Sequence, residues 1–94
     1  MPRGVILIDW TDQGRRAIKE SPDRAEAAKA AATKLGVQVK EIVFTPGGPH
    51  DAAMSIEADG PEPIGKFMSD VQALGNVKLK FVRAFSIEEM RKMV

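Results

Sequence analysis

His50 is the only histidine in the chain, and it is the side chain best suited to acid–base chemistry near neutral pH. An imidazole can act as a general base, a proton shuttle or one metal ligand. A dyad with Asp51 is disfavoured, because neighbouring side chains on an extended backbone point to opposite faces. Asp9, or Asp51 from across the strand pair, could serve as a carboxylate partner of His50 only if the geometry brings the two side chains together. We favour the simpler interpretation of a loop histidine that caps its turn or packs locally.

The other residues that could do chemistry also have simpler explanations. Asp51 can accept backbone N–H bonds in its turn. Trp10, the only tryptophan, is more typical of a core or interface anchor than of a platform for ligand stacking. No phosphate-binding glycine motif and no clustered zinc ligands occur in the sequence. We therefore expect no metal and no cofactor.

The charges are almost balanced, with fourteen Lys and Arg against thirteen Asp and Glu and a net charge of +1. Such a chain has no long-range field to attract nucleic acid or an anionic membrane. It contains no cysteine, which excludes disulfides and thiol chemistry. The apolar run at residues 5–8 is too short for a membrane span or a signal-peptide core. We expect a cytoplasmic protein without nucleic-acid or membrane partners.

Four segments have the pattern of β-strands. Residues 4–10 (GVILIDW) are continuously apolar in the middle, as in a strand covered on both faces. Residues 37–45 and 52–58 flank a turn rich in Pro and Gly, which predicts a hairpin. Residues 77–85 (VKLKFVRAF) alternate in the manner of a strand. No linker or repeat divides the chain, so residues 1–94 are predicted to form a single domain.

Two longer helices are predicted between the strands. Ser21 as N-cap, Pro22 in the first turn and Gly36 as a left-handed C-terminal cap delimit the first helix. The second runs between a proline at position 61 or 63 and Gly75. The first helix carries a stripe of small side chains, which lets a helix sit close on a sheet: Ala25, Ala28, Ala32 and Leu35.

Two shorter helical turns complete the pattern. Thr11 can cap a turn that holds Ile18. Ser86 and Glu89 have the spacing of a capping box, which predicts a short final helix.

The order β-α-β-β-α-β predicts an α+β, ferredoxin-like fold with a four-stranded antiparallel sheet. Right-handed crossovers place the first and third strands in the centre and the second and fourth at the edges. The predicted edge strands carry Lys40, Lys78 and Lys80, whereas the central strands carry no lysine. Lysine on an edge strand discourages stray pairing, so the charges agree with this topology.

The first strand is apolar on both faces, with Val5 and Leu7 on one side and Ile6 and Ile8 on the other. Two helices cover only one face of the sheet. In so short a chain, the simplest cover for the second face is the same face of another copy. We therefore predict a homodimer formed through the open sheet face.

The chain resembles the GYD domain family along nearly its whole length, in the stretches DWTDQG (9–14), IKESPDRAEAA (18–28), KLG (34–36), FTPG (44–47), GPHD (48–51) and LGNV (74–77). The closing RAF (83–85) before an acidic helix fits as well. The resemblance implies a dimeric α/β barrel, and it implies no activity because the family has no established common function. The family's naming motif is Gly-x-Tyr-Asp, and His50 replaces the tyrosine here, which puts any role of that hydroxyl in doubt.

The topology predicts which residues meet. The ends of the first two strands and the starts of the last two share one edge of the domain. Arg83 and Glu57 should lie toward the opposite edge. The predicted ligand-binding cluster therefore comprises Asp9, Trp10, Thr45, His50, Asp51 and Asn76.

Three classes of function remain open. The first, which we favour, is a module that binds a small hydrophobic ligand or a partner without catalysis. The second is a cofactor-free isomerase, decarboxylase or monooxygenase acting on a hydrophobic small molecule, with His50 as the catalytic acid or base. The third is a structural subunit that assembles beyond the dimer. A closed cavity beside Trp10 and His50 would be the most informative observation.

Overall fold

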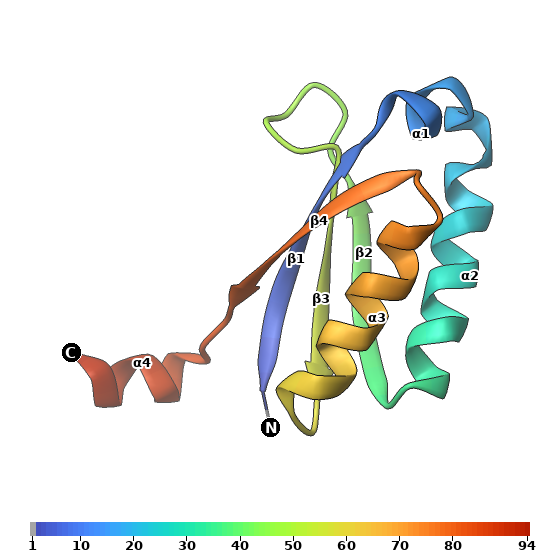
Figure 1. The fold of residues 1–94 in the computed structure, drawn as a ribbon. Coiled ribbons are helices and arrows are strands. Elements are labelled where there is room, and N and C mark those ends of the chain that lie inside the picture. The colour runs from blue at the N-terminus through green and yellow to red at the C-terminus, as the bar shows by residue number, and fades with distance from the viewer. Residues whose placement is uncertain (1) are drawn as a thin grey trace.

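A computed structural model describes residues 2–94 (Figure 1). Its elements are β1 (Arg3–Trp10), α1 (Asp12–Arg16), the 3₁₀ turn η1 (Ile18–Glu20), α2 (Ser21–Lys34), β2 (Val37–Phe44), β3 (Ala52–Ala58), α3 (Pro61–Ala73), β4 (Val77–Arg83) and α4 (Ile87–Met93). The strands form one antiparallel sheet in the order β2-β3-β1-β4. The predicted α+β fold and its strand order are confirmed.

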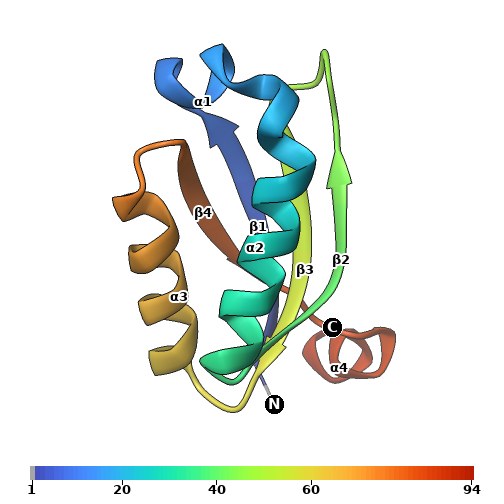
Figure 2. The same ribbon diagram turned by 90° about the vertical axis from the view of Figure 1, so that its right-hand side faces the viewer.

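Helices α2 and α3 lie side by side on one face of the sheet (Figure 2). On the central strands, alternate residues point toward these helices, as Ile6 and Ile8 on β1 and Met54 and Ile56 on β3 do, and all four are buried. Phe67 of α3 is also fully buried. The apolar core therefore lies between the sheet and the two helices.

The edge strands, β2 and β4, are those predicted from the topology, and the lysines lie on them as expected. Lys40 lies on β2, and Lys78 and Lys80 lie on β4. A register shift between Val39 and Glu41 interrupts the pairing of β2 with β3. A lysine and an irregularity on the same edge strand both discourage pairing with another sheet.

The start of α2 differs from the prediction. Ser21 is itself helical (φ −59°, ψ −37°), Glu20 occupies the N-cap position, and no side chain caps the helix. The reason is that η1 leads directly into α2, so the Ser21 N–H already donates to the Ile18 carbonyl. Thr11 does cap α1, accepting from the Gly14 N–H, but Ile18 lies in η1 and not in the capped turn.

The ends of the two long helices follow the prediction. Gly36 and Gly75 have φ of +84° and +83°, the left-handed conformation that favours glycine after a helix. The strands β2 and β4 end slightly earlier than predicted, at Phe44 and Arg83.

The final helix, α4, has the predicted capping box. The Ser86 hydroxyl accepts from the Glu89 N–H at 3.1 Å, and the Glu89 carboxylate accepts from the Ser86 N–H at 2.8 Å. Helix α4 projects from the end of β4 on the side of the sheet opposite α2 and α3 (Figure 1). Its Ile87, Met90 and Met93 side chains are exposed.

The sheet face opposite α2 and α3 is left open within this chain. Val5 and Leu7 of β1 lie on it, partly buried by their neighbours, with Ala53 of β3 opposite Leu7. Val43 of β2 and Val82 of β4 extend the apolar patch toward the edges and are 43% and 49% exposed. Strand β1 is therefore apolar on both faces, as predicted, while Lys80 of β4 lies opposite Leu7 on the open face.

Candidate functional site

The structure brings the six predicted site residues to one end of the sheet. The Asp51 N–H donates to the Ile8 carbonyl at 2.9 Å, and the Trp10 N–H donates to Asp51 Oδ2 at 2.9 Å. The Thr45 hydroxyl donates to the His50 carbonyl at 2.6 Å. These bonds fix the 45–51 loop against the end of β1.

The start of β4 joins the same end of the sheet. The Asn76 carbonyl accepts from the Thr11 N–H at 3.1 Å, directly after β1. At the other end, Glu57 pairs with Arg3 at 3.4 Å, and Arg83 lies opposite Gly4. The two residues expected at the opposite edge are therefore found there.

The six residues do not share one pocket, because they divide between the two faces of the sheet. Asp9 lies on the open face, opposite Lys78 of β4, and contacts the His50 imidazole. Trp10, the next residue, points to the helix face, as alternation along a strand requires. Asn76 lies with Trp10 on the helix side.

The Asp9–His50 pair is the arrangement in this cluster that could move a proton. His50 Nδ1 lies 3.1 Å from Asp9 Oδ1 and 3.2 Å from Asp9 Oδ2. A carboxylate in this position favours a proton on Nδ1 and leaves Nε2 to exchange a proton with another group. Both side chains are about one-third exposed, at 31% and 35%, so water screens their interaction.

The Asp51 carboxylate does not act as a partner of His50, because it is engaged by other groups. Its carboxylate accepts the Trp10 N–H and lies 3.9 Å from the Arg15 guanidinium, which is 61% exposed. The Asp51 carboxylate is therefore engaged away from His50, and because both residues lie in the loop before β3, the alternation argument for an extended backbone does not apply to them.

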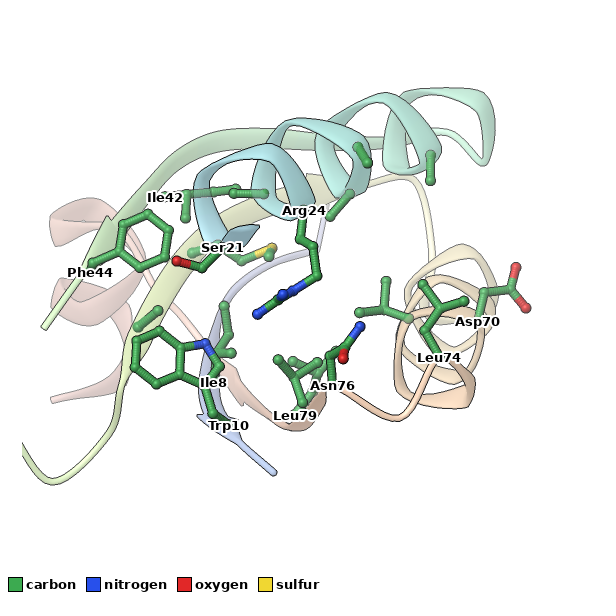
Figure 3. Close-up of a pocket in the computed structure, with 18 residues that line it drawn as sticks. Ile8, Trp10, Ser21, Arg24, Ile42, Phe44, Asp70, Leu74, Asn76 and Leu79 are labelled. Carbon is green, nitrogen blue, oxygen red and sulfur yellow. The ribbon is translucent and has the colours of Figure 1, made fainter. Parts of the chain in front are cut away.

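A cavity of about 450 Å³ lies on the helix side of the sheet, between the strands and helices α2 and α3, and it is open to solvent at a rim that includes the exposed Phe44 and Leu74 (Figure 3). Its volume falls in the range of small-molecule sites, about 300–1,000 Å³. The walls are mainly apolar, and the sheet and α3 contribute Ile8, Ile42, Met54, Val71, Val77 and Leu79. Trp10 and Asn76 line this cavity, whereas His50 is not among its lining residues.

The alanine stripe of α2 explains much of this space. We predicted that it allows close packing on the sheet, and Ala32 is indeed fully buried. Nearer the start of the helix, Ala25, Ala28 and Ala31 line the cavity instead of filling it. A methyl group is too short to reach the facing wall, so small residues leave a void wherever the helix does not approach the sheet.

Arg24 is the site residue that the sequence prediction missed. Its guanidinium donates to the Ala17 carbonyl at 2.9 Å and to the Gly14 carbonyl at 3.3 Å, and the side chain lines the cavity. Figure 3 shows this side chain extending from α2 toward the space between Trp10 and Asn76. The available signal was its position four residues before Ala28, on the same helix face as the stripe.

Gly14 determines how closely α1 approaches the cavity. It is buried, and a Cβ added there would collide with the Asn76 carbonyl oxygen and lie 3.0 Å from its carbon. Only glycine allows so close an approach of two backbones. The contact therefore fixes Asn76 and the Arg24 acceptor, the Gly14 carbonyl, relative to each other.

The described part of the chain has neither a metal-binding cluster nor a membrane-spanning helix. Residues 2–94 contain no group of three or more His, Asp or Glu side chains placed to hold a metal ion. Over the same residues, no helix has the length and apolar character needed to cross a membrane.

The fold and the cavity define a class: a four-stranded antiparallel α+β domain with two helices on one sheet face and an apolar cavity beneath them. The sequence model of the GYD domain matches residues 5–94. The chain belongs to the GYD domain family. A comparison with curated proteins found no match.

Proposed function

We propose that this protein is a ligand-binding module that takes up a small hydrophobic molecule in the cavity beneath α2 and α3. The observation that carries the proposal is the cavity itself, of about 450 Å³ and walled mainly by apolar side chains. Replacing water in such a space by an apolar ligand is favourable in free energy, because it removes the apolar walls from water. Met54 supports the proposal further, because a flexible thioether adapts to the shape of a ligand.

The test is the uptake of an uncharged apolar dye, N-phenylnaphthylamine, whose fluorescence rises in apolar surroundings. We expect saturable binding of one dye per chain. Ala28→Phe should abolish it, because the added ring occupies the cavity that Ala28 lines. Ala30→Phe is the matched control, since Ala30 is an exposed residue of the same helix outside the cavity wall. If the two variants bind the dye with equal affinity, the dye binds outside the cavity, and the proposal is contradicted.

The proposed assembly is a homodimer formed through the open sheet face. Its support is the apolar patch on that face, which includes Val5, Leu7 and Val82. Burying such a patch against a second copy removes apolar area from water on both chains. Helix α4 projects on the same side with exposed apolar residues, so it is placed to contact the second copy (Figure 1). A stable folded monomer in sedimentation at micromolar concentration would contradict the dimer.

The alternative function, a cofactor-free enzyme with His50 as acid or base, is favoured by one observation, the contact of His50 with Asp9. The pair lies on the open face and does not line the cavity. A substrate of His50 would therefore bind at the open end of the sheet and not beneath the helices. In that case His50→Ala abolishes turnover and leaves dye binding in the cavity unchanged.

A further inference from the structure

We infer that the cavity selects an apolar monocarboxylate, with Arg24 as the group that receives the carboxylate. The inference rests on the proposed function and specifies the class of ligand. Its basis is that the cavity is apolar along most of its wall and carries one guanidinium that lacks an anionic partner.

The charge of Arg24 is uncompensated within the described chain. Arg24 is partly buried, and it takes part in none of the ion pairs found among residues 2–94. Two of its five N–H donors are used by the backbone carbonyls of Ala17 and Gly14. Three donors remain, and a guanidinium binds a carboxylate especially well because its planar fork matches the two oxygens.

The neighbouring polar groups also favour an acceptor as ligand. Asn76 Oδ1 already accepts from the Gln13 side chain at 3.0 Å, which leaves the Asn76 amide N–H groups to donate. The Ser21 hydroxyl also lines the cavity, but in Figure 3 it points toward Phe44 and away from the Arg24 guanidinium. The Asn76 amide is therefore the neighbouring donor that suits the oxygens of a carboxylate.

The one carboxylate on the cavity wall does not neutralise Arg24. Asp70 pairs with Lys66 at 3.3 Å on the surface of α3. Its carboxylate points away from Arg24 in Figure 3. The cavity thus presents a single positive charge to its contents.

The single positive charge and the apolar wall determine the charge of the ligand and the character of its remaining part. A dianion would bring a second charge into a space with one cation, and burying an unpaired charge is costly. A neutral ligand of the same length would fill the apolar part but leave the guanidinium without its charge-assisted bonds. The best complement is one carboxylate attached to an apolar body that extends toward Ile8, Met54 and Leu79.

Decanoate and decanol test this inference, because they share an alkyl chain and differ in the charge of the head group. Trp10 is the only tryptophan and lines the cavity, so its fluorescence reports binding directly. At about pH 7 the acid is ionised. We expect the wild-type protein to bind decanoate about tenfold or more tighter than decanol, as a charge-assisted pair allows.

Arg24→Gln removes the charge and keeps a polar side chain with amide donors, although its shorter side chain ends near the position of Arg24 Nε. In this variant decanoate should lose its advantage over decanol, while decanol affinity stays unchanged. Arg16→Gln is the matched control, because Arg16 is an exposed residue outside the cavity wall, and it should retain the preference. Circular dichroism checks that both variants fold.

The outcomes separate the two proposals. Equal affinity of the wild-type protein for decanoate and decanol overturns the carboxylate inference and leaves the ligand-binding function standing, and this comparison needs no variant. An unchanged decanoate preference in Arg24→Gln also overturns the inference. Failure of decanoate, decanol and the uncharged dye to bind overturns both proposals.

Discussion

Replacing Gly14 with alanine should destabilise the protein far more than the same change at another helical glycine. The added Cβ would collide with the Asn76 carbonyl oxygen, which belongs to the backbone and cannot turn away as a side chain can. Overpacking of this kind costs about 1–3 kcal/mol. The same carbonyl accepts the Thr11 N–H at 3.1 Å, and losing that bond adds about 1 kcal/mol.

The matched comparison is Gly65→Ala in α3. Gly65 is exposed, and an added Cβ there meets no atom within 4 Å. Alanine in place of glycine inside a helix stabilises by roughly 0.5–1 kcal/mol. The two variants thus contain the same chemical change, and the expected effects on the free energy of unfolding have opposite signs.

Urea denaturation followed by circular dichroism measures both effects. Overpacking and the lost bond together cost roughly 2–4 kcal/mol, and the helix propensity of alanine offsets roughly 0.5–1 kcal/mol of this, so Gly14→Ala should lose roughly 1–3.5 kcal/mol and move the urea midpoint down by on the order of 1 M. Gly65→Ala should move the midpoint slightly upward. If Gly14→Ala is as stable as the wild-type protein, α1 does not lie against Asn76 as described. The positioning of Arg24 through the Gly14 carbonyl would then lose its structural basis.

Three further changes test other parts of the structure. Leu7→Glu places a charge in the middle of the open sheet face, so sedimentation at micromolar concentration should show monomers for this variant and dimers for the wild-type protein; dimers of both would refute that interface. Phe67→Ala removes a fully buried ring and should cost about 3–5 kcal/mol in urea denaturation, whereas Phe85→Ala, at a 46% exposed residue, should cost much less. The backbone hydrogen bond from Ser86 holds the pKa of Glu89 below its ordinary value. The stability that the ionised Glu89 gives to α4 is therefore complete above the ordinary glutamate pKa and disappears as pH falls through the lowered folded-state pKa. The NMR shifts of residues 87–93 should therefore move toward coil values in acid, and Glu89→Gln should weaken that change.

The sequence predicted the sheet well because its strands carry strong local patterns. The β3 boundaries, Ala52–Ala58, match the prediction, since alternate residues of this strand are buried and the flanking turns are rich in Gly, Pro and Asp. The right-handed crossovers predicted β2 and β4 as the edge strands, and the lysines on these strands agree with that placement. The prediction of Ser21 as the N-cap of α2 was wrong because the 3₁₀ turn η1 leads directly into the helix. The hydrogen bonds of such a turn have no clear sequence signature.

The convergence of the site residues followed from topology, but their division between two faces needed coordinates. Alternation along β1 separates Asp9 from Trp10, and this much is readable in the sequence. The direction of the His50 side chain cannot be predicted in this way, because His50 lies in the loop between β2 and β3. Its contact with Asp9 depends on how that loop folds over the end of the sheet.

The cavity could not be predicted from α2 alone, because a stripe of alanines is compatible with two opposite outcomes. Where the helix lies against the sheet, as at Ala32, small side chains close the gap. Nearer the start of the helix, as at Ala25, the same residue type lines the gap. Arg24 extends from the open end of this stripe and is held by carbonyls of the α1 segment. The carbonyls that hold Arg24 belong to another segment of the chain, so the spacing of residues along α2 does not by itself determine where the gap opens.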